Sequence, residues 1–205
     1  MQHRHVILQA LLAVLLGLWL AVPVAVQAEV PRGADMTPVT GDIVLRAGNG
    51  AWAFLARRFS ESDPRWSHAG VILREGETVR VVHMDGSPAG GEIRADSLET
   101  FSAGPQATQL VRTGLDAAQR RRVGDWLAGQ LARGTPFDTQ FRLEDDSALY
   151  CSELVWRALE HVDPALDQAD LPRMAGRSYI PVDRLLQLGD AGPVPGRGAP
   201  VPAVQ

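Results

Sequence analysis

The spacing of hydrophobic residues divides the chain into a strand-rich first part and a helix-rich second part. Short apolar runs rich in β-branched residues are typical of strands, and Gly or polar residues separate them. Extended segments are expected at 43–45, 67–74 and 78–84, around Ile93, and at 106–113. Glu75 and Gly76 separate two of these runs and predict a two-residue hairpin loop.

Amphipathic helices are predicted where apolar residues recur every three to four positions. They are expected at 52–59, 117–133, 151–161 and 182–188. Asp116 and Gln119 have the spacing of a capping box at the start of the second helix, and Gly134 is expected to end it. Strands that come first in a run, with helices flanking them, predict an α+β domain with a small antiparallel sheet packed against helices.

The predicted hairpin brings two histidines together. If Glu75 and Gly76 form the loop, pairing outward from it places His68 directly opposite His83. Directly opposed residues share a face of the sheet, with Cβ atoms about 4.5–5.5 Å apart. A slip of one residue would move the two imidazoles to opposite faces. The sequence therefore predicts a pair of histidines on one face.

The two ends of the chain differ in composition from its middle. Residues 1–28 combine a short basic start, a long apolar run and a small-residue ending, which predicts a signal peptide; the alternative is an uncleaved membrane anchor. Residues 29–40 are expected to form a linker and residues 41–190 a single domain. Residues 191–205 are rich in Pro and Gly and predict a disordered tail. We expect an exported bacterial protein, periplasmic or extracellular, with no stable membrane span after cleavage.

The charge of the chain argues against nucleic-acid binding. The formal net charge is −4, and every basic residue apart from the histidines is an arginine. These arginines are scattered, except for a triplet at 120–122 that is typical of a solvated helix face. A nucleic-acid-binding protein would need a basic face. We therefore expect no nucleic-acid partner.

Cys151 is the only cysteine, so it cannot form a disulfide within the chain. It begins a predicted amphipathic helix, where free N–H groups and the helix dipole favour a thiolate and could also bind an oxyanion. A thiol in this position beside a histidine is typical of a reactive nucleophile with a lowered pKa. The alternative is a buried core cysteine, since free cysteine is among the most buried residue types.

A metal site is a weaker alternative. Cys151, His68 and His83 are possible zinc ligands, and Asp42 or Asp138 could complete the set. None of the spacings that are diagnostic of zinc sites occurs in the chain. We therefore expect neither a metal nor another cofactor.

The chain contains the motif Ser-His-Ala-Gly-Val at 67–71 and, after it, the motif Tyr-Cys-Ser-Glu-Leu-Val at 150–155. This pair, in this order, carries most of a resemblance to the permuted papain-like cysteine hydrolases of the NlpC-related superfamily, specifically the YaeF/YiiX-like amidase group. The histidine precedes the cysteine, which is the mark of the permuted branch. The matching segments are 41–45, 67–71, 136–138 with Phe141, 150–155 and 179–181.

The resemblance implies a permuted papain-like (NlpC-like) fold with the nucleophile at a helix N-terminus. It makes Cys151 the nucleophile and His68 the general base, and His83 stands where the family places a third, orienting residue. Substrate-pocket or supporting positions are implied for Tyr150, Asp138, Asp42 and Ser67.

The substrate is expected to be an amide. A peptidoglycan stem peptide comes first, because the protein is expected to be exported, and an acyl ester or lipid is the alternative. A stem peptide would need a polar groove, whereas an acyl chain would need an apolar tunnel beside Trp52 and Phe59. A third possibility is a catalytically silent binding protein on the same fold.

Overall fold

The structure is a computed structural model that describes residues 37–87, 89–104, 107–144, 146–166, 168–192 and 194. The predicted signal peptide, residues 29–36 of the predicted linker and most of the predicted tail lie outside the described residues. None of the helices within the described part combines the length and the apolar character that crossing a membrane requires.

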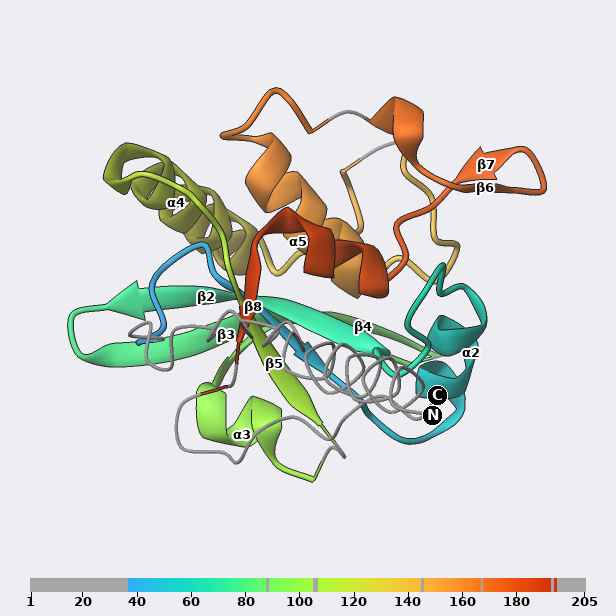
Figure 1. The fold of residues 1–205 in the computed structure, drawn as a ribbon, viewed down its shortest axis with the longest axis horizontal. Coiled ribbons are helices and arrows are strands. Elements are labelled where there is room, and N and C mark those ends of the chain that lie inside the picture. The colour runs from blue at the N-terminus through green and yellow to red at the C-terminus, as the bar shows by residue number, and fades with distance from the viewer. Residues whose placement is uncertain are drawn as a thin grey trace, which may run out of the picture. The chain divides into compact units, whose positions relative to one another are not determined.

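An antiparallel six-stranded sheet forms the centre of the domain, in the order β4-β3-β2-β1-β5-β8 (Figure 1). All four strands nearest its β4 edge come from the first half of the domain, as their hydrophobic pattern predicts. The strands are β1 (Ile43–Arg46), β2 (His68–Glu75), β3 (Thr78–Ser87), β4 (Gly90–Ser97), β5 (Thr108–Arg112) and β8 (Asp190–Gly192). A separate small hairpin consists of β6 (Arg173–Met174) and β7 (Arg177–Ser178).

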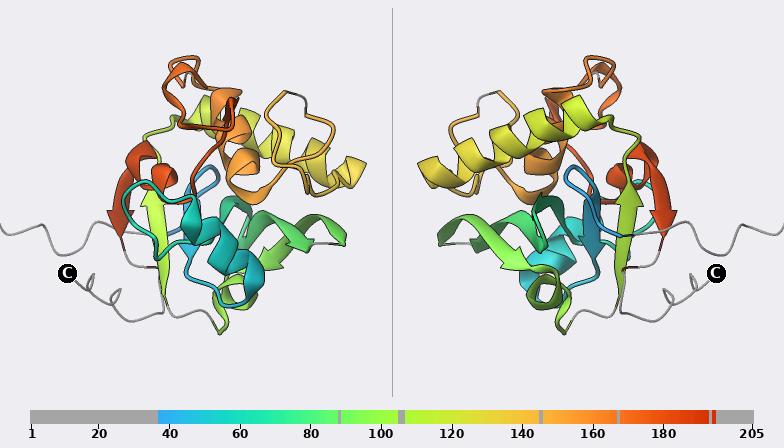
Figure 2. Two further views of the ribbon diagram at one scale, coloured as in Figure 1. Left: turned by 90° about the vertical axis from the view of Figure 1, so that its right-hand side faces the viewer. Right: turned by 90° about the vertical axis from the view of Figure 1, so that its left-hand side faces the viewer.

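Helices cover both faces of this sheet (Figures 1 and 2). The helices α4 and α5 lie on one face and the short α3 on the other, while α2 lies at one end of the strands. Their bounds are α2 (Ala51–Arg58), α3 (Leu98–Ser102), α4 (Ala117–Arg133) and α5 (Cys151–Glu160), with short 3₁₀ helices η1 (Gln168–Asp170) and η2 (Asp183–Leu188). This arrangement confirms the predicted α+β fold.

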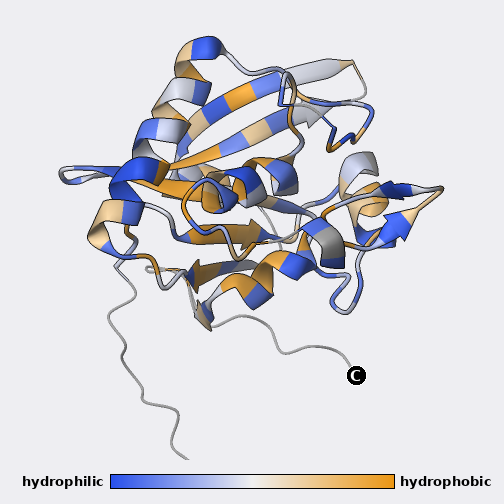
Figure 3. Ribbon diagram, turned by 90° about the horizontal axis from the view of Figure 1, so that it is seen from above, coloured by the Kyte–Doolittle hydropathy of each residue, from blue (hydrophilic) through white to orange (hydrophobic). Residues whose placement is uncertain are grey.

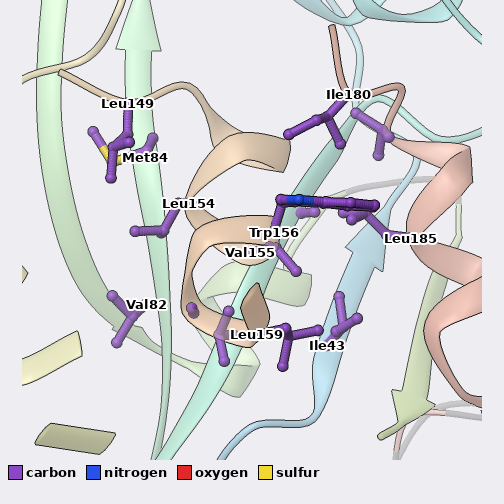
Figure 4. Close-up of a cluster of buried hydrophobic side chains, with 14 of the residues drawn as sticks. Ile43, Val82, Met84, Leu149, Leu154, Val155, Trp156, Leu159, Ile180 and Leu185 are labelled. Atoms are coloured by element: carbon purple, nitrogen blue, oxygen red, sulfur yellow. The ribbon is translucent and has the colours of Figure 1, made fainter. Parts of the chain in front are cut away.

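The main hydrophobic core lies between the sheet and α5. Leu154, Val155 and Leu159 of α5 face Ile43 of β1 and Val82 of β3 (Figure 4). Long hydrophobic stretches along the strands supply the opposite wall of this core (Figure 3). Burial of these apolar side chains holds α5 against the sheet and thereby fixes where the helix begins.

A smaller core lies on the other face of the sheet. It contains Val44, Ile72, Val81, Phe101 and Leu110. Phe101 comes from α3 and is fully buried. The hydrophobic pattern does not predict α3, because its five residues are too few to show a helical period.

The predicted hairpin register is wrong by two positions. The loop consists of Gly76 and Glu77, so Gly70, and not His68, pairs with His83. Gly76 has φ 61°, which suits the first loop position of a hairpin turn, where glycine is favoured. A shift of two keeps every side chain on its predicted face, and the histidines still lie on the same one.

The helix predictions agree with the structure except for the last, which is the 3₁₀ helix η2, whereas the prediction for the tail is wrong at its start. The capping box of Asp116 and Gln119 is present, and Gly134 ends α4 in the left-handed conformation. The predicted tail is wrong at its start, because Ala191 and Gly192 belong to β8, and Val194 is buried. Backbone pairing with β5 orders this short segment despite its low intrinsic strand propensity.

Candidate active site

Cys151 is the first residue of α5, and its side chain is half-buried. The first hydrogen bond within the helix runs from the Leu154 N–H to the Tyr150 carbonyl, so the N–H groups of Cys151 and Ser152 have no acceptor within the helix. These two groups and the Ala69 N–H of β2 hydrogen-bond the sulfur. The thiol therefore lies in a ring of backbone donors.

A chain of three polar side chains crosses β2, β3 and β4 beside this thiol. His68 Nε2 lies 3.1 Å from His83 Nδ1, and His83 Nε2 lies 3.0 Å from Asp96 Oδ2. The two imidazole rings are perpendicular, with centroids 5.1 Å apart. Gly70 pairs with His83 and lies two residues after His68, on the same face of β2. Its lack of a side chain leaves room for the His83 ring to reach the His68 ring diagonally.

The carboxylate at the end of this chain determines where the protons lie. Asp96 accepts a hydrogen bond, so His83 Nε2 donates, and His83 Nδ1 is the acceptor when the ring is neutral. His68 Nε2 must then donate to His83, which leaves Nδ1 of His68 without a proton. The unprotonated Nδ1 is the form that can accept a thiol proton.

His68 begins β2, and Cys151 lies beside this end of the strand. The imidazoles of His68 and His83 contact Phe101 of the smaller core, whereas α5 packs on the opposite face. His68 is the first residue of β2, and the next residue, Ala69, donates its N–H to the Cys151 sulfur. His68 and Cys151 also line one cavity, so both members of the predicted pair border the same space.

Burial favours the neutral form of both the Cys151 thiol and the His68 imidazole. It raises the pKa of the Cys151 thiol, although the surrounding N–H groups and the Arg46 charge act in the opposite direction. The pKa of His68 lies well below 6.5 because of burial and the nearby His83 and Arg46. The sequence predicted a lowered thiol pKa from the helix terminus, and that prediction is wrong because desolvation is the larger effect.

Two cavities meet at Cys151. The first, here called the apolar cavity, has a volume of about 280 Å³ and reaches under the β6–β7 hairpin. Besides Cys151, its wall includes Phe59, Phe141, Tyr150, Met174, Tyr179, Ile180 and Val182. The second, here called the histidine-side cavity, has a volume of about 380 Å³. Its wall includes Arg46, Trp52, Ser67, His68, Asp85 and Cys151.

Tyr150 and Ser67 lie at these cavities, as the resemblance implied. The Tyr150 hydroxyl accepts a hydrogen bond of 3.0 Å from the Ile180 N–H, which holds the segment leading to η2 against α5. Ser67 Oγ accepts a hydrogen bond of 2.9 Å from the Gly48 N–H. Each hydroxyl thus supports one wall of the site.

Asp42 and Asp138 do not lie at the cavities. Asp42 is fully buried at the start of β1, at the opposite end of this strand from Arg46, and it pairs with Arg112 at 3.0 Å. Asp138 accepts hydrogen bonds from the N–H groups of Gln140 and Arg142 and orders the loop that carries Phe141. Of the two roles implied for these carboxylates, the structure therefore excludes a place in the cavity wall, and it leaves Asp138 as a support for the loop of Phe141 and Asp42 as a support for the fold.

Sequence reasoning missed three residues of the site, namely Asp96, Arg46 and Phe101. The strand around Ile93 was predicted, and its alternation would have put Asp96 and Arg94 on one face. Only the pairing of β4 with β3 shows that this is the face of His83.

Within the described residues, no group of three or more His, Cys, Asp or Glu side chains is placed to hold a metal ion. The expectation that the protein needs no cofactor stays a prediction.

Residues 37–174 match the model of a family described as permuted papain-like amidase enzyme, YaeF/YiiX, C92 family. The structure is similar to the crystal structure of metalloprotein yiiX from Escherichia coli O157:H7, with a TM-score of 0.57 and 19% sequence identity. This likeness covers 75% of the chain and 93% of that protein, and it shows a shared fold. A comparison with curated protein sequences gives no match.

The neutral state of both groups predicts a specific pH dependence. Alkylation of Cys151 by iodoacetamide should increase with pH with a midpoint above about 8.5, the ordinary value for a thiol, because burial raises its pKa. The acid limb of kcat/KM should lie below pH 6.5, because His68 must be neutral to accept a proton and its pKa is lowered. A thiol midpoint well below 8.5 that rises in His68→Ala would instead show a resting ion pair.

Proposed function

The chain belongs to the permuted papain-like amidase family and is a papain-like cysteine hydrolase; we propose that Cys151 is its nucleophile and that it cleaves an amide of an apolar acyl group. The observation that carries this proposal is the position of Cys151 where an apolar cavity meets the end of the His68–His83–Asp96 chain.

The reaction proceeds through a thioester. His68 Nδ1 takes the thiol proton as the Cys151 sulfur attacks the amide carbonyl carbon, and a tetrahedral oxyanion forms. The imidazolium then gives its proton to the amide nitrogen, the carbon–nitrogen bond breaks, and the amine leaves. Water attacks the thioester while His68 takes a proton from it. The acid departs, and the proton returns to the Cys151 sulfur.

The start of α5 stabilises the charged states of this reaction. The N–H groups of Cys151 and Ser152 point toward the reacting atoms and have no acceptor within the helix. Such preorganised donors stabilise a developing oxyanion more than they stabilise a neutral carbonyl. His83 keeps the His68 ring in the reactive tautomer, and Asp96 does the same for His83. His83 and Asp96 are therefore positioning residues.

The position of His68 decides which cavity holds which half of the substrate. The imidazole that protonates the leaving nitrogen must lie beside it, and His68 lines the histidine-side cavity but not the apolar one. The leaving amine therefore occupies the histidine-side cavity. The acyl group occupies the apolar cavity, where burial of its methylene groups contributes to binding.

The walls of the apolar cavity favour an apolar acyl group, which the second of the two expected substrate classes contains, over a stem peptide; the scissile bond of the proposed substrate remains an amide. A stem peptide carries carboxylates near its scissile bonds, and among the described residues that line the apolar cavity Arg177, at its rim, is the only charged one. An acyl chain meets aromatic and aliphatic side chains instead. The protein is proposed to act after export, on the basis of its N-terminal composition.

Four substitutions test the assignment of the catalytic residues. Cys151→Ala should abolish turnover, and His68→Ala should reduce kcat by roughly 10²–10⁴-fold, the usual contribution of a general base. His83→Ala and Asp96→Ala should give intermediate losses, because each acts through the next ring. His161→Ala is the control, since this exposed histidine lies at the opposite end of α5. Equal, mild losses in all four site variants would contradict the assignment.

A series of acyl amides of aminomethylcoumarin tests the substrate class. From acetyl through butanoyl to octanoyl, kcat/KM should rise roughly two- to fourfold for each methylene that becomes buried. Met174→Glu places a charge at the half-exposed rim of the apolar cavity and should lower cleavage of the octanoyl amide more than that of the acetyl amide. Faster cleavage of a stem peptide than of every acyl amide would refute this substrate assignment.

A further inference from the structure

Arg46 is a partly buried cation beside His68 and Cys151. It has no role in the proposed mechanism. It is the last residue of β1, pairs directly with His68 of β2, and lines the histidine-side cavity together with His68 and Cys151. Its guanidinium carbon lies 4.6 Å from the centre of the Phe101 ring, and its Nη1 donates a 3.0 Å hydrogen bond to the Phe101 carbonyl. The guanidinium is therefore held in place before any substrate binds.

No carboxylate of the described residues forms an ion pair with Arg46. The two nearby acids have other partners. Asp85 lies 3.0 Å from Arg94, and Asp96 is bound to His83. A guanidinium carries five N–H donors, and the hydrogen bond to Phe101 uses only one of its nitrogens. Within the described residues the histidine-side cavity thus contains a positioned guanidinium that forms no salt bridge, and Asp85 and Asp96 act on its charge only from a distance.

We propose that Arg46 binds a carboxylate on the leaving group, so that the substrates are amides between an apolar acyl group and an amino acid or short peptide with a free carboxylate. This inference rests on the proposed function, which puts the leaving amine in the histidine-side cavity. In an N-acyl amino acid the carboxylate is attached one carbon beyond the amide nitrogen, so it lies on the same side of Cys151 as Arg46. A guanidinium matches the planar geometry of a carboxylate and binds it through paired hydrogen bonds. Hydrolysis then releases a fatty acid and the amino acid, with water as the only co-reactant.

A matched pair of substrates isolates this contact. N-octanoylglycine and N-octanoylglycinamide share the acyl group and the scissile amide, and they differ in whether the leaving group carries a carboxylate. The wild-type enzyme should prefer the carboxylate by roughly 10- to 100-fold in kcat/KM, the range expected for a hydrogen bond between charged groups. Arg46→Gln should remove the preference by lowering the value for octanoylglycine alone. Arg46→Lys should retain part of it, since it keeps the charge but loses the planar fork.

Arg74→Gln is the control variant. Arg74 lies near the opposite end of β2 from His68, beside the hairpin loop, and should leave the preference unchanged. Thermal unfolding of all variants shows whether Arg46→Gln remains folded. If Arg46→Gln does not fold, the Arg46→Lys variant decides the matter, because a preference equal to that of the wild type would show that the planar fork makes no contact.

Binding to the Cys151→Ala variant separates this inference from the proposed function. Calorimetry should show tighter binding of octanoylglycine than of octanoylglycinamide, and Arg46→Gln in the same background should abolish the difference, whether or not the wild type turns either compound over. Equal binding of the two compounds, with acyl amides still cleaved by the wild type, would overturn the carboxylate site and leave the proposed function standing. Equal losses on both substrates in Arg46→Gln would show that Arg46 acts on the thiol and imidazole instead.

Discussion

The hydrogen-bond chain from Asp96 through His83 to His68 is the constraint on which the site depends. It crosses three adjacent strands, so it exists only if β2, β3 and β4 are aligned in one register. A slip of one residue in either pairing would move one of these side chains to the opposite face of the sheet. The register brings the three side chains together, and their hydrogen bonds then fix which nitrogen of His68 carries no proton.

Burial shifts the pKa values of the two groups that the proposed mechanism uses, Cys151 and His68. Phe101 covers both imidazoles, and α5 holds the thiol against the start of β2, so desolvation disfavours the charged form of each group. The backbone donors at the start of α5 offset part of this cost without removing it. In the proposed mechanism the pair is neutral at rest and becomes charged only as a substrate reacts, and the donors already in place stabilise that charge.

The hydrophobic pattern predicted the strands, the helices and the face of each histidine, but it did not predict the hairpin register. Loops at Glu75–Gly76 and at Gly76–Glu77 differ by two positions in the pairing, and both leave the same side chains in the core. Backbone preference at Gly76 decides between the two loops. This difference brings Gly70 opposite His83, and the diagonal contact with His68 follows.

The residues that the sequence did not reveal depend on contacts between distant segments. Asp96 belongs to the site because β4 pairs with β3, and Phe101 because α3 folds back over the histidines. Asp42 stands in a motif shared with the family, yet its partners are Arg112 and Arg120 at the other end of β1. A motif identifies residues that the family has in common, whereas only the three-dimensional structure separates those that support the fold from those that reach the substrate.

Nitrogen-15 NMR of the histidine side chains tests this account most directly, because it distinguishes the two neutral tautomers from the imidazolium. At pH 7 the account predicts that His68 and His83 are both neutral, each with its proton on Nε2, and that Asp96→Ala disturbs this arrangement in both rings. A proton on Nδ1 of His68, or an imidazolium at that position, would contradict it, because the Nδ1 that the mechanism needs as acceptor for the proton of Cys151 would then already carry one.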